Sequence, residues 1–422
     1  MINYTFPETG RAIILIIITA WAALLSHKCI SNFNDGIRPI FPELIEGRMS
    51  REDFAKTVIG MSAGWILAGF SHWLGYGLIA CHFTLIATDC IGAKSTNKWM
   101  AIGLGALWGA ICFYGTNGIQ ALFNSLPYNF TSDLINISKP VLPVLCLFPS
   151  VAIAEQYGPK KGIITGVIQV LVYIISILKS LNPYTFAMLA GIVCLIVFVV
   201  TDKNNVAIEM FEEEKQLFSK NINRIKSNWV YLCIQGGLTA LGIATLAQAY
   251  QPEILSATVQ EGDISIFIVA MIGVAFAFIP LAVSSALSTG VYQAIGIKTT
   301  VFVGALFYNS DYWYLAFVAG FIAEYIEIQS LEKIDNVLSK YPVWSQAGDH
   351  VRNAITSCIT LALSVGSFVA GNAIWGITGM CIVGAFYSIN EVTGRRIPKN
   401  AVGSVAAVVV GILYNIAILL GL

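Results

Sequence analysis

Charged residues are scarce in this chain. Asp, Glu, Lys and Arg make up only 11% of its 422 residues, whereas soluble domains contain roughly 25%. The two signs cancel to a net charge of zero, so nothing in the charge indicates a nucleic-acid partner. Hydrophobic residues make up 56%, and apolar runs of about 17 to 25 residues, each long enough to cross a bilayer, recur along the whole length. The composition excludes a soluble protein and predicts an all-α polytopic membrane protein.

Motifs of catalytic and metal sites are also missing. No HExxH, P-loop or CxxC pattern occurs, and the nine cysteines are scattered, mostly within apolar runs. The segment 60–64 fits the G-x-S-x-G pattern of a hydrolase nucleophile, but its flanks predict an apolar helix and not a strand-to-helix turn. We therefore expect no enzyme, no metal site and no cofactor beyond a coupling ion such as H⁺ or Na⁺. The run 11–25 lacks a small-residue cleavage site and is expected to stay as a membrane span.

The apolar runs predict roughly 11 to 14 transmembrane or re-entrant helices. The runs 57–73, 76–92 and 295–308 are short and are predicted to be half-helices or re-entrant hairpins. We expect spans near 10–28, 57–73, 76–92, 100–124, 140–156, 160–179, 183–201, 228–249, 264–288, 295–308, 312–331, 352–370, 373–390 and 400–421.

A charged stretch divides these spans into two membrane halves. Residues 202–227 carry apolar side chains at helical spacing and are expected to form an amphipathic cytoplasmic linker between 1–201 and 228–422. With this linker in the cytoplasm, the acidic segment 250–263 and both termini are expected to lie outside the cytoplasm. The positive-inside rule supports that orientation, because the basic residues outside the cytoplasm are then only Arg11, Lys139 and Lys179.

The stretch 278–298 predicts a discontinuous helix at a binding site. Its apolar start meets Pro280, and proline removes a backbone hydrogen bond from a helix. In hydrocarbon the freed groups need partners, so such breaks occur inside the protein or beside a watery cavity. The alternative is a kinked helix whose hydroxyls bond their own backbone. The candidate solute ligands here are Pro280, Ser284, Ser285, Ser288 and Thr289.

The stretch 148–162 is similar to 278–298. Both have a proline, then small residues, a Tyr, a Gly and a Lys. Pro149 and Ser150 are therefore added to the candidate solute ligands. The similarity predicts two related halves that meet near Pro149 and Pro280, since matched interruptions mark the binding sites of transporters.

Two carboxylates inside predicted spans are candidates for ion coupling. Glu324 lies deep in the span 312–331, where a charge needs a partner or a role in an ion path. Asp89 lies nearer to a helix end, where capping is the simpler explanation. We predict Glu324 and Asp89 as coupling residues.

Short motifs are spread over nearly the whole length of the chain. They are NDGIRP at 34–39, LIEG at 44–47, TD at 88–89, GALWG at 105–109, FP at 148–149, ALSTGVY at 286–292, AE at 323–324, RNA at 352–354 and NE-x-x-GR at 390–395. Together these motifs resemble the YhfT family of bacterial inner-membrane proteins. The resemblance implies the inner membrane and a transporter without an assigned substrate. Members tend to be encoded near predicted metabolic enzymes, which points to a small polar metabolite.

These observations favour an ion-coupled secondary transporter of a small polar or anionic metabolite. The alternative is the permease component of a multi-subunit, phosphotransferase-like uptake system; a membrane-embedded enzyme or a scaffold is less favoured. The expected partners are membrane lipid, the solute and a second copy of the chain. The homodimer is predicted from helix faces of small residues such as Gly105 and Gly109.

Overall fold

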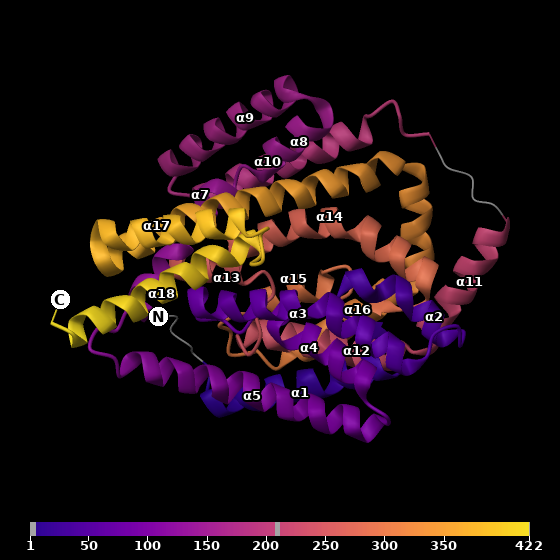
Figure 1. The fold of residues 1–422 in the computed structure, drawn as a ribbon. Helices are drawn as coiled ribbons and strands as arrows, with labels where there is room; N and C mark the ends of the chain where they lie inside the picture. The colour runs from indigo at the N-terminus through magenta and orange to yellow at the C-terminus, as the bar shows by residue number, and fades with distance from the viewer. Residues whose placement is uncertain (1–5, 207–211, 422) are drawn as a thin grey trace.

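The chain is almost entirely helical in a computed structural model that describes residues 6–206 and 212–421 (Figure 1). Within these residues seven helices are long and apolar enough to cross a membrane. There are eight if the bent pair Thr131–Leu145 and Phe148–Tyr157 counts as one span. The prediction of an all-α polytopic membrane protein is confirmed.

The two halves begin with the same order of elements. The first contains α1 (Glu8–His27), β1 (Ser31–Asn32), η1 (Asp35–Ile40), α2 (Phe41–Ile45), α3 (Arg51–Tyr76), α4 (Cys81–Lys94) and α5 (Lys98–Asn124). The second contains α12 (Trp229–Ala244), α13 (Pro252–Glu261), α14 (Ser265–Thr289), β2 (Tyr292–Gln293), α15 (Thr299–Leu306) and α16 (Leu315–Lys340). Each is a helix, a break with short helices, a long helix, a second break with a shorter helix, and a long helix.

Further helices follow each of these units. After α5 come α6 (Thr131–Leu134), η2 (Ile135–Ile137), α7 (Val141–Leu145), α8 (Phe148–Tyr157), α9 (Pro159–Leu178), α10 (Pro183–Val200) and α11 (Glu212–Ser227). After α16 come α17 (Pro342–Val392) and α18 (Lys399–Leu419). Non-helical dihedrals at Trp375 and Gly376 divide α17. The chain folds back there, because Gly371 contacts Gly379.

The first helices of the two units run in opposite directions. Lys28 at the end of α1 donates to the Tyr231 hydroxyl near the start of α12, at 3.1 Å. Further along, Ile18 of α1 packs against Gly242, close to the end of α12. The first helices of the units are therefore antiparallel. An inverted repeat of this kind places the breaks of both halves near one another, as in many transporters.

The breaks of the two units pair with each other. β1 and β2 form a parallel strand pair with Ser31 opposite Tyr292, which we call the strand pair. Ala80, before α4, forms a parallel bridge with Ala249, before α13, which we call the alanine bridge. Each contact joins the first break of one unit to the second break of the other.

Helix packing gathers the elements into two groups. One consists of α1, α3, α4, α5, α12, α15 and α16; the other consists of α7 to α10, α17 and α18, with α13 and α14 between the groups (Figure 1). Glycines allow close contact within the first group: a Cβ on Gly105 of α5 would lie 2.6 Å from the Thr19 carbonyl oxygen of α1. Each group draws helices from both sides of 202–227, so the division of the chain at this segment stays a sequence prediction.

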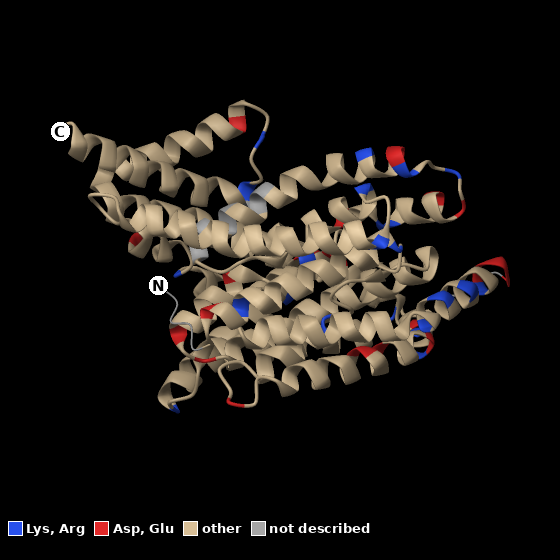
Figure 2. Ribbon diagram, turned by 90° about the horizontal axis from the view of Figure 1, so that it is seen from below, with Lys and Arg blue, Asp and Glu red and all other residues tan. Residues whose placement is uncertain are grey.

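The two ends of the bundle differ in charge. Many Lys and Arg residues gather at the end that holds α11, and few lie at the end with both termini (Figure 2). The segment 250–263, expected as an acidic loop outside the cytoplasm, contains the helix α13, whose residues 252–258 are buried. Its place outside the cytoplasm stays a prediction. Its apolar residues pack into the main core, and the hydrophobic burial of these residues outweighs the charges of Glu253 and Glu261 in placing the helix.

Candidate functional site

The strand pair begins where α1 and α14 end. Beyond α14, Gly290 takes a left-handed conformation with φ of 67°, which costs glycine nothing. The backbone N–H of Tyr292 donates to the Ile30 carbonyl at 3.1 Å, and that of Ala294 donates to Asn32 at 2.9 Å. These bonds satisfy part of the backbone that two helix breaks would otherwise leave unpaired.

Asp89 of α4 holds the first of these breaks. Its carboxylate accepts hydrogen bonds from the backbone N–H groups of Phe33, at 3.0 Å, and Asn34, at 2.8 Å. Asp89 is only 2% exposed. A carboxylate that accepts two backbone N–H groups fixes the extended chain after β1. The structure thus gives Asp89 an anchoring contact, and its role in ion coupling stays a prediction.

A second polar network joins the two strands. Arg38, which is fully buried, forms an ion pair with Asp35. Asp35 also accepts a hydrogen bond of 3.2 Å from Gln293 of β2, and Arg38 donates to the Asn32 side chain of β1. A buried arginine needs such partners, because its desolvation is costly. The network therefore fixes the two halves against each other.

Two buried carboxylates of α16 face the loop after β2. Glu327 accepts hydrogen bonds from the Tyr292 hydroxyl, the Ile297 backbone N–H and Thr299. Glu324, one turn earlier and 2% exposed, has one carboxylate oxygen, Oε2, without a hydrogen-bond partner among the described residues. Both carboxylates lie close to Gly296. A Cβ added to this glycine would lie 2.8 Å from Oε2 of Glu324. Two buried carboxylates this close favour uptake of a proton or a cation.

Lys298 is the cation next to this pair. It is 1% exposed, and its Nζ has no hydrogen-bond partner among the described residues. The amine instead faces two aromatic rings, at 5.2 Å from Tyr250 and 5.0 Å from Phe278. Its backbone is left-handed, with φ of 84°, a conformation that costs a residue with a side chain energy. Strain and a buried charge at one residue mark a functional position.

Helix α11 closes the strand pair on its outer side. Arg224 donates to the carbonyls of Cys29, at 2.9 Å, and Gly290, at 3.3 Å. Asn221 donates to the Leu287 carbonyl at 2.6 Å. Burial lowers the pKa of the Arg224 guanidinium, yet this group stays charged at physiological pH. One cation thus binds carbonyls at the ends of both α1 and α14.

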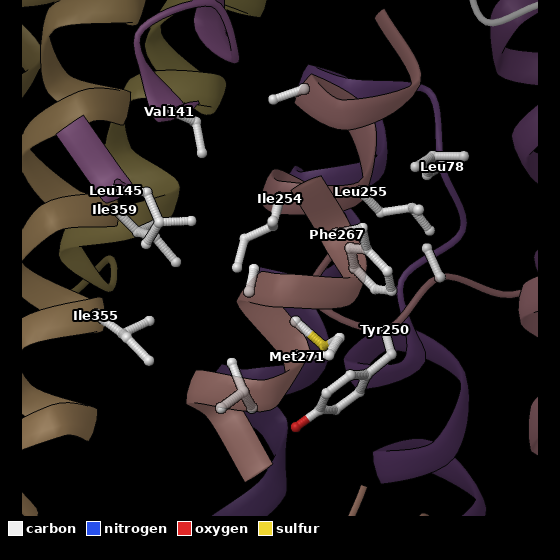
Figure 3. Packing of buried hydrophobic residues seen from close by; sticks show 14 of the residues in the cluster. Leu78, Val141, Leu145, Tyr250, Ile254, Leu255, Phe267, Met271, Ile355 and Ile359 are labelled. Carbon is white, nitrogen blue, oxygen red and sulfur yellow. The ribbon is translucent and has the colours of Figure 1, made fainter. Parts of the chain in front are cut away.

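A cavity of about 260 Å³ lies beside the alanine bridge. Its walls come from α3, α4, α13, α14 and α17, so it opens between the two helix groups. Figure 3 shows Ile355 and Ile359 of α17 pointing toward Ile254 and Met271, with Tyr250 beyond them. The polar and charged residues of its lining are His82, Gln251, Glu253, Arg352, Thr356 and Thr360.

The structure does not bring the predicted solute ligands together. Pro149 and Ser150 begin α8, and the neighbouring Phe148 packs against Gly273 of α14. That contact lies about three helical turns before Ser284. The two proline stretches lie at different places in their helices: Pro149 is at the start of α8, and Pro280 is inside α14. Their match as a repeat stays a prediction. The same order of elements occurs in the units that start with α1 and α12.

The prediction of a break at Pro280 is wrong as well. α14 continues through Pro280 to Thr289, and the chain leaves the helix at Gly290. Apolar packing on both sides of the proline offsets the lost hydrogen bond. The hydroxyls of Ser284, Ser288 and Thr289 donate to carbonyls of the same helix. This is the alternative that the sequence left open, and a solute contact by Ser285 or its neighbours stays a prediction.

Sequence reasoning missed three charged residues. The orientation predicted from the basic residues puts Lys298 and Arg352 on the cytoplasmic side, and no motif marks Glu327. A signal existed for Glu327, since it follows Glu324 by one helical turn and shares its face. Lys298 stands at the start of a short apolar run, where a half-helix would hold it inside the bundle.

Comparison with known proteins places the chain in a family. The model of the YhfT family, described as a protein of unknown function, matches residues 11–422. The chain is 32% identical over 440 residues to the Uncharacterized protein YhfT of Escherichia coli (strain K12), and the match covers 98% of each chain. No solved structure matches the chain significantly. This protein therefore belongs to the YhfT family.

Proposed function

We propose that this protein is an ion-coupled secondary transporter that carries a small polar or anionic metabolite across the bacterial cytoplasmic membrane. The inverted repeat supports this function, because transporters bind their cargo where discontinuous helices of two inverted units meet. Under the positive-inside rule, the end with α11 lies in the cytoplasm and both termini lie outside it. The protein needs no catalytic residue and no resident cofactor in this function.

The observation that carries the proposal is the carboxylate pair of α16 against Lys298. Glu324 and Glu327 lie buried at the same glycine, at the point where the loop after β2 enters α15. Binding of H⁺ or Na⁺ removes the repulsion between the carboxylates. The loop that contains Lys298 is then free to change its contacts, and the strand pair moves with it. An ion can drive transport only through such a difference between two states.

Asp89 has a secondary role in this scheme. It holds the backbone of Phe33 and Asn34, so protonation of Asp89 would release the first break. We keep Asp89 as a coupling residue secondary to Glu324. A homodimer is also part of the proposal. It is tested by the mass of the purified protein in mild detergent, and a monomeric mass would contradict it.

Uptake into proteoliposomes tests the function. A panel of small metabolites is offered with and without an inward gradient of H⁺ or Na⁺. We expect at least one solute to accumulate only with a gradient. Glu324→Gln should remove the gradient dependence and keep solute exchange, because the neutral amide imitates the ion-bound carboxylate. Glu332→Gln is the control, since Glu332 lies exposed on the same helix. The absence of gradient-driven uptake for the whole panel, or an unchanged response in Glu324→Gln, would contradict the proposal.

A further inference from the structure

The cavity beside the alanine bridge contains opposite charges that the ion-coupling scheme does not use. We propose that it is the solute site and that the solute is a small zwitterion of the amino-acid type. Arg352 then binds the carboxylate, and Glu253 binds the ammonium group. This inference rests on the proposed transport function and names its substrate class.

The volume of the cavity suits such a molecule. About 260 Å³ has room for roughly nine water molecules of about 30 Å³ each. The apolar part of the lining comes from Trp65, Phe278, Ile355 and Ile359. A ligand with two charged groups and a short apolar side chain matches these dimensions and this lining.

Arg352 supplies the positive charge. It lies in the first part of α17, where Nη1 donates to the Ala277 carbonyl at 2.5 Å and Nη2 pairs with Asp349. These bonds involve two of its five N–H donors and orient the planar group. Asp349 is 67% exposed, so water screens this pair and a ligand carboxylate can compete with it. Thr356 and Thr360 stand one and two turns further along α17 and also line the cavity.

Glu253 supplies the negative charge. It stands in the first turn of α13, just after the alanine bridge, and is only 5% exposed. His82, in the first turn of α4, also lines the cavity. A buried carboxylate attracts a ligand ammonium strongly, because the surroundings screen the charges little.

The two charges together select against ligands with one charged group. A simple carboxylate would bind Arg352 but lie in the field of Glu253. A simple amine would bind Glu253 but be repelled by the charge of Arg352. Only a ligand with both groups satisfies both residues, and a site built to bind a polar group rejects analogues without it.

The cavity contacts the ion-coupling residues through one aromatic ring. Phe278 lines the cavity and lies 5.5 Å from the Arg352 guanidinium and 5.0 Å from the Lys298 amine. A ligand that moves Arg352 therefore changes the surroundings of Lys298, whose charge acts on Glu324 and Glu327. Packed side chains of this kind can couple two sites when both depend on one moving element.

Binding to purified protein in detergent tests the substrate class. The probes are the L-amino acids, each with its amine that lacks the carboxyl group and its carboxylic acid that lacks the amino group. We expect at least one amino acid to bind, and its two analogues to bind at least about a hundredfold more weakly. Arg352→Gln and Glu253→Gln should each weaken amino-acid binding by about ten- to a hundredfold. Glu253→Gln should also reduce the difference in affinity between the amino acid and the carboxylic acid that lacks its amino group.

Control variants separate binding from folding. Glu391→Gln and Arg395→Gln remove an exposed ion pair elsewhere and should leave affinity unchanged. If Arg352→Gln fails to give a monodisperse protein, Thr360→Val serves in its place and should lower affinity about threefold or more.

Two outcomes would overturn the inference: binding by no amino acid, or equal binding of an amino acid and its carboxylic acid. Amino-acid binding without gradient-driven uptake would keep this site and reject the transport function. Gradient-driven uptake of another solute, unaffected by Arg352→Gln, would keep the transport function and reject this site.

Discussion

The strand pair and the alanine bridge have the same place in the topology but differ in the residues around them. Each joins a break of one inverted unit to a break of the other. Around the strand pair, buried charged groups bind backbone and one another, and Arg224 closes its outer side. The alanine bridge consists of two backbone hydrogen bonds of 2.8 Å, from Cys81 to Ala249 and from Ala249 to Ile79, and a cavity opens beside it. One topology thus gives a closed polar contact at one place and an open site at the other.

This difference assigns separate tasks to the two contacts. Glu324 and Glu327 are buried carboxylates that lie close to each other, so they can respond to an ion. Small residues such as Ala80 and Ala249 leave space for a solute. If the strand pair responds to the ion and the alanine bridge borders the solute, substitutions at the first should disturb folding and coupling, and substitutions at the second should mainly disturb binding.

The largest effect is expected from Lys298→Met. The substitution removes the buried cation whose charge acts on Glu324 and Glu327. Because the full loss of a buried ion-pair partner costs about 3–5 kcal/mol, that range is the upper limit of the expected effect. Thermal unfolding in detergent should show a large fall in stability. Adding Glu327→Gln to Lys298→Met should restore part of it, because fewer negative charges remain. Lys333→Met, at an exposed position of α16, is the control; an equal fall in both single variants would remove Lys298 from the scheme.

The two contacts can be compared directly through glycine. Gly296 and Gly77 both have positive φ, of 55° and 71°, and alanine there costs about 1–2 kcal/mol. A Cβ on Gly296 would also meet Glu324 and Glu327, whereas a Cβ on Gly77 would meet no atom within 4 Å. Crowding adds about 1–3 kcal/mol, so Gly296→Ala should lower the unfolding temperature more than Gly77→Ala. Equal shifts would show that the carboxylates can move away freely.

The sequence predicted long helices better than the contacts between their breaks. The expected span 264–288 is α14 almost residue for residue, because continuous hydrophobicity over that length has few other solutions in a membrane. The helix α13 within 250–263 is harder to predict, because the acidic residues of this segment hide an apolar face that packs in the core. The place of Glu324 deep in an apolar span is enough to predict that it is buried. The burial of Lys298 cannot be predicted in this way, because it depends on the pairing of β2 with β1, a strand far away in the chain.

A smaller effect is expected from Arg224→Gln in α11. The variant loses charge-assisted hydrogen bonds to the carbonyls of Cys29 and Gly290, each worth about 1.5–3 kcal/mol when buried and less at a half-exposed position. Hydrogen exchange should speed up in the strand pair and stay unchanged at the alanine bridge. Lys220→Gln, exposed on the same helix, should have no effect. Faster exchange at both places would mean that α11 stabilises the whole bundle.

The smallest effect is expected from Ser288→Ala. The Ser288 hydroxyl donates to the Ser284 carbonyl of its own helix at 2.8 Å, and an exposed bond of this kind contributes little, so stability should change by less than about 0.5 kcal/mol. The sequence pattern by itself predicts a different result, because a hydroxyl that binds the solute would be worth about 0.5–1.5 kcal/mol. Calorimetry with an amino acid that binds the wild type distinguishes the two cases. Unchanged affinity in Ser288→Ala, together with weaker binding in Thr360→Val, would locate the solute at the alanine bridge, and the opposite pair of results would locate it at the end of α14.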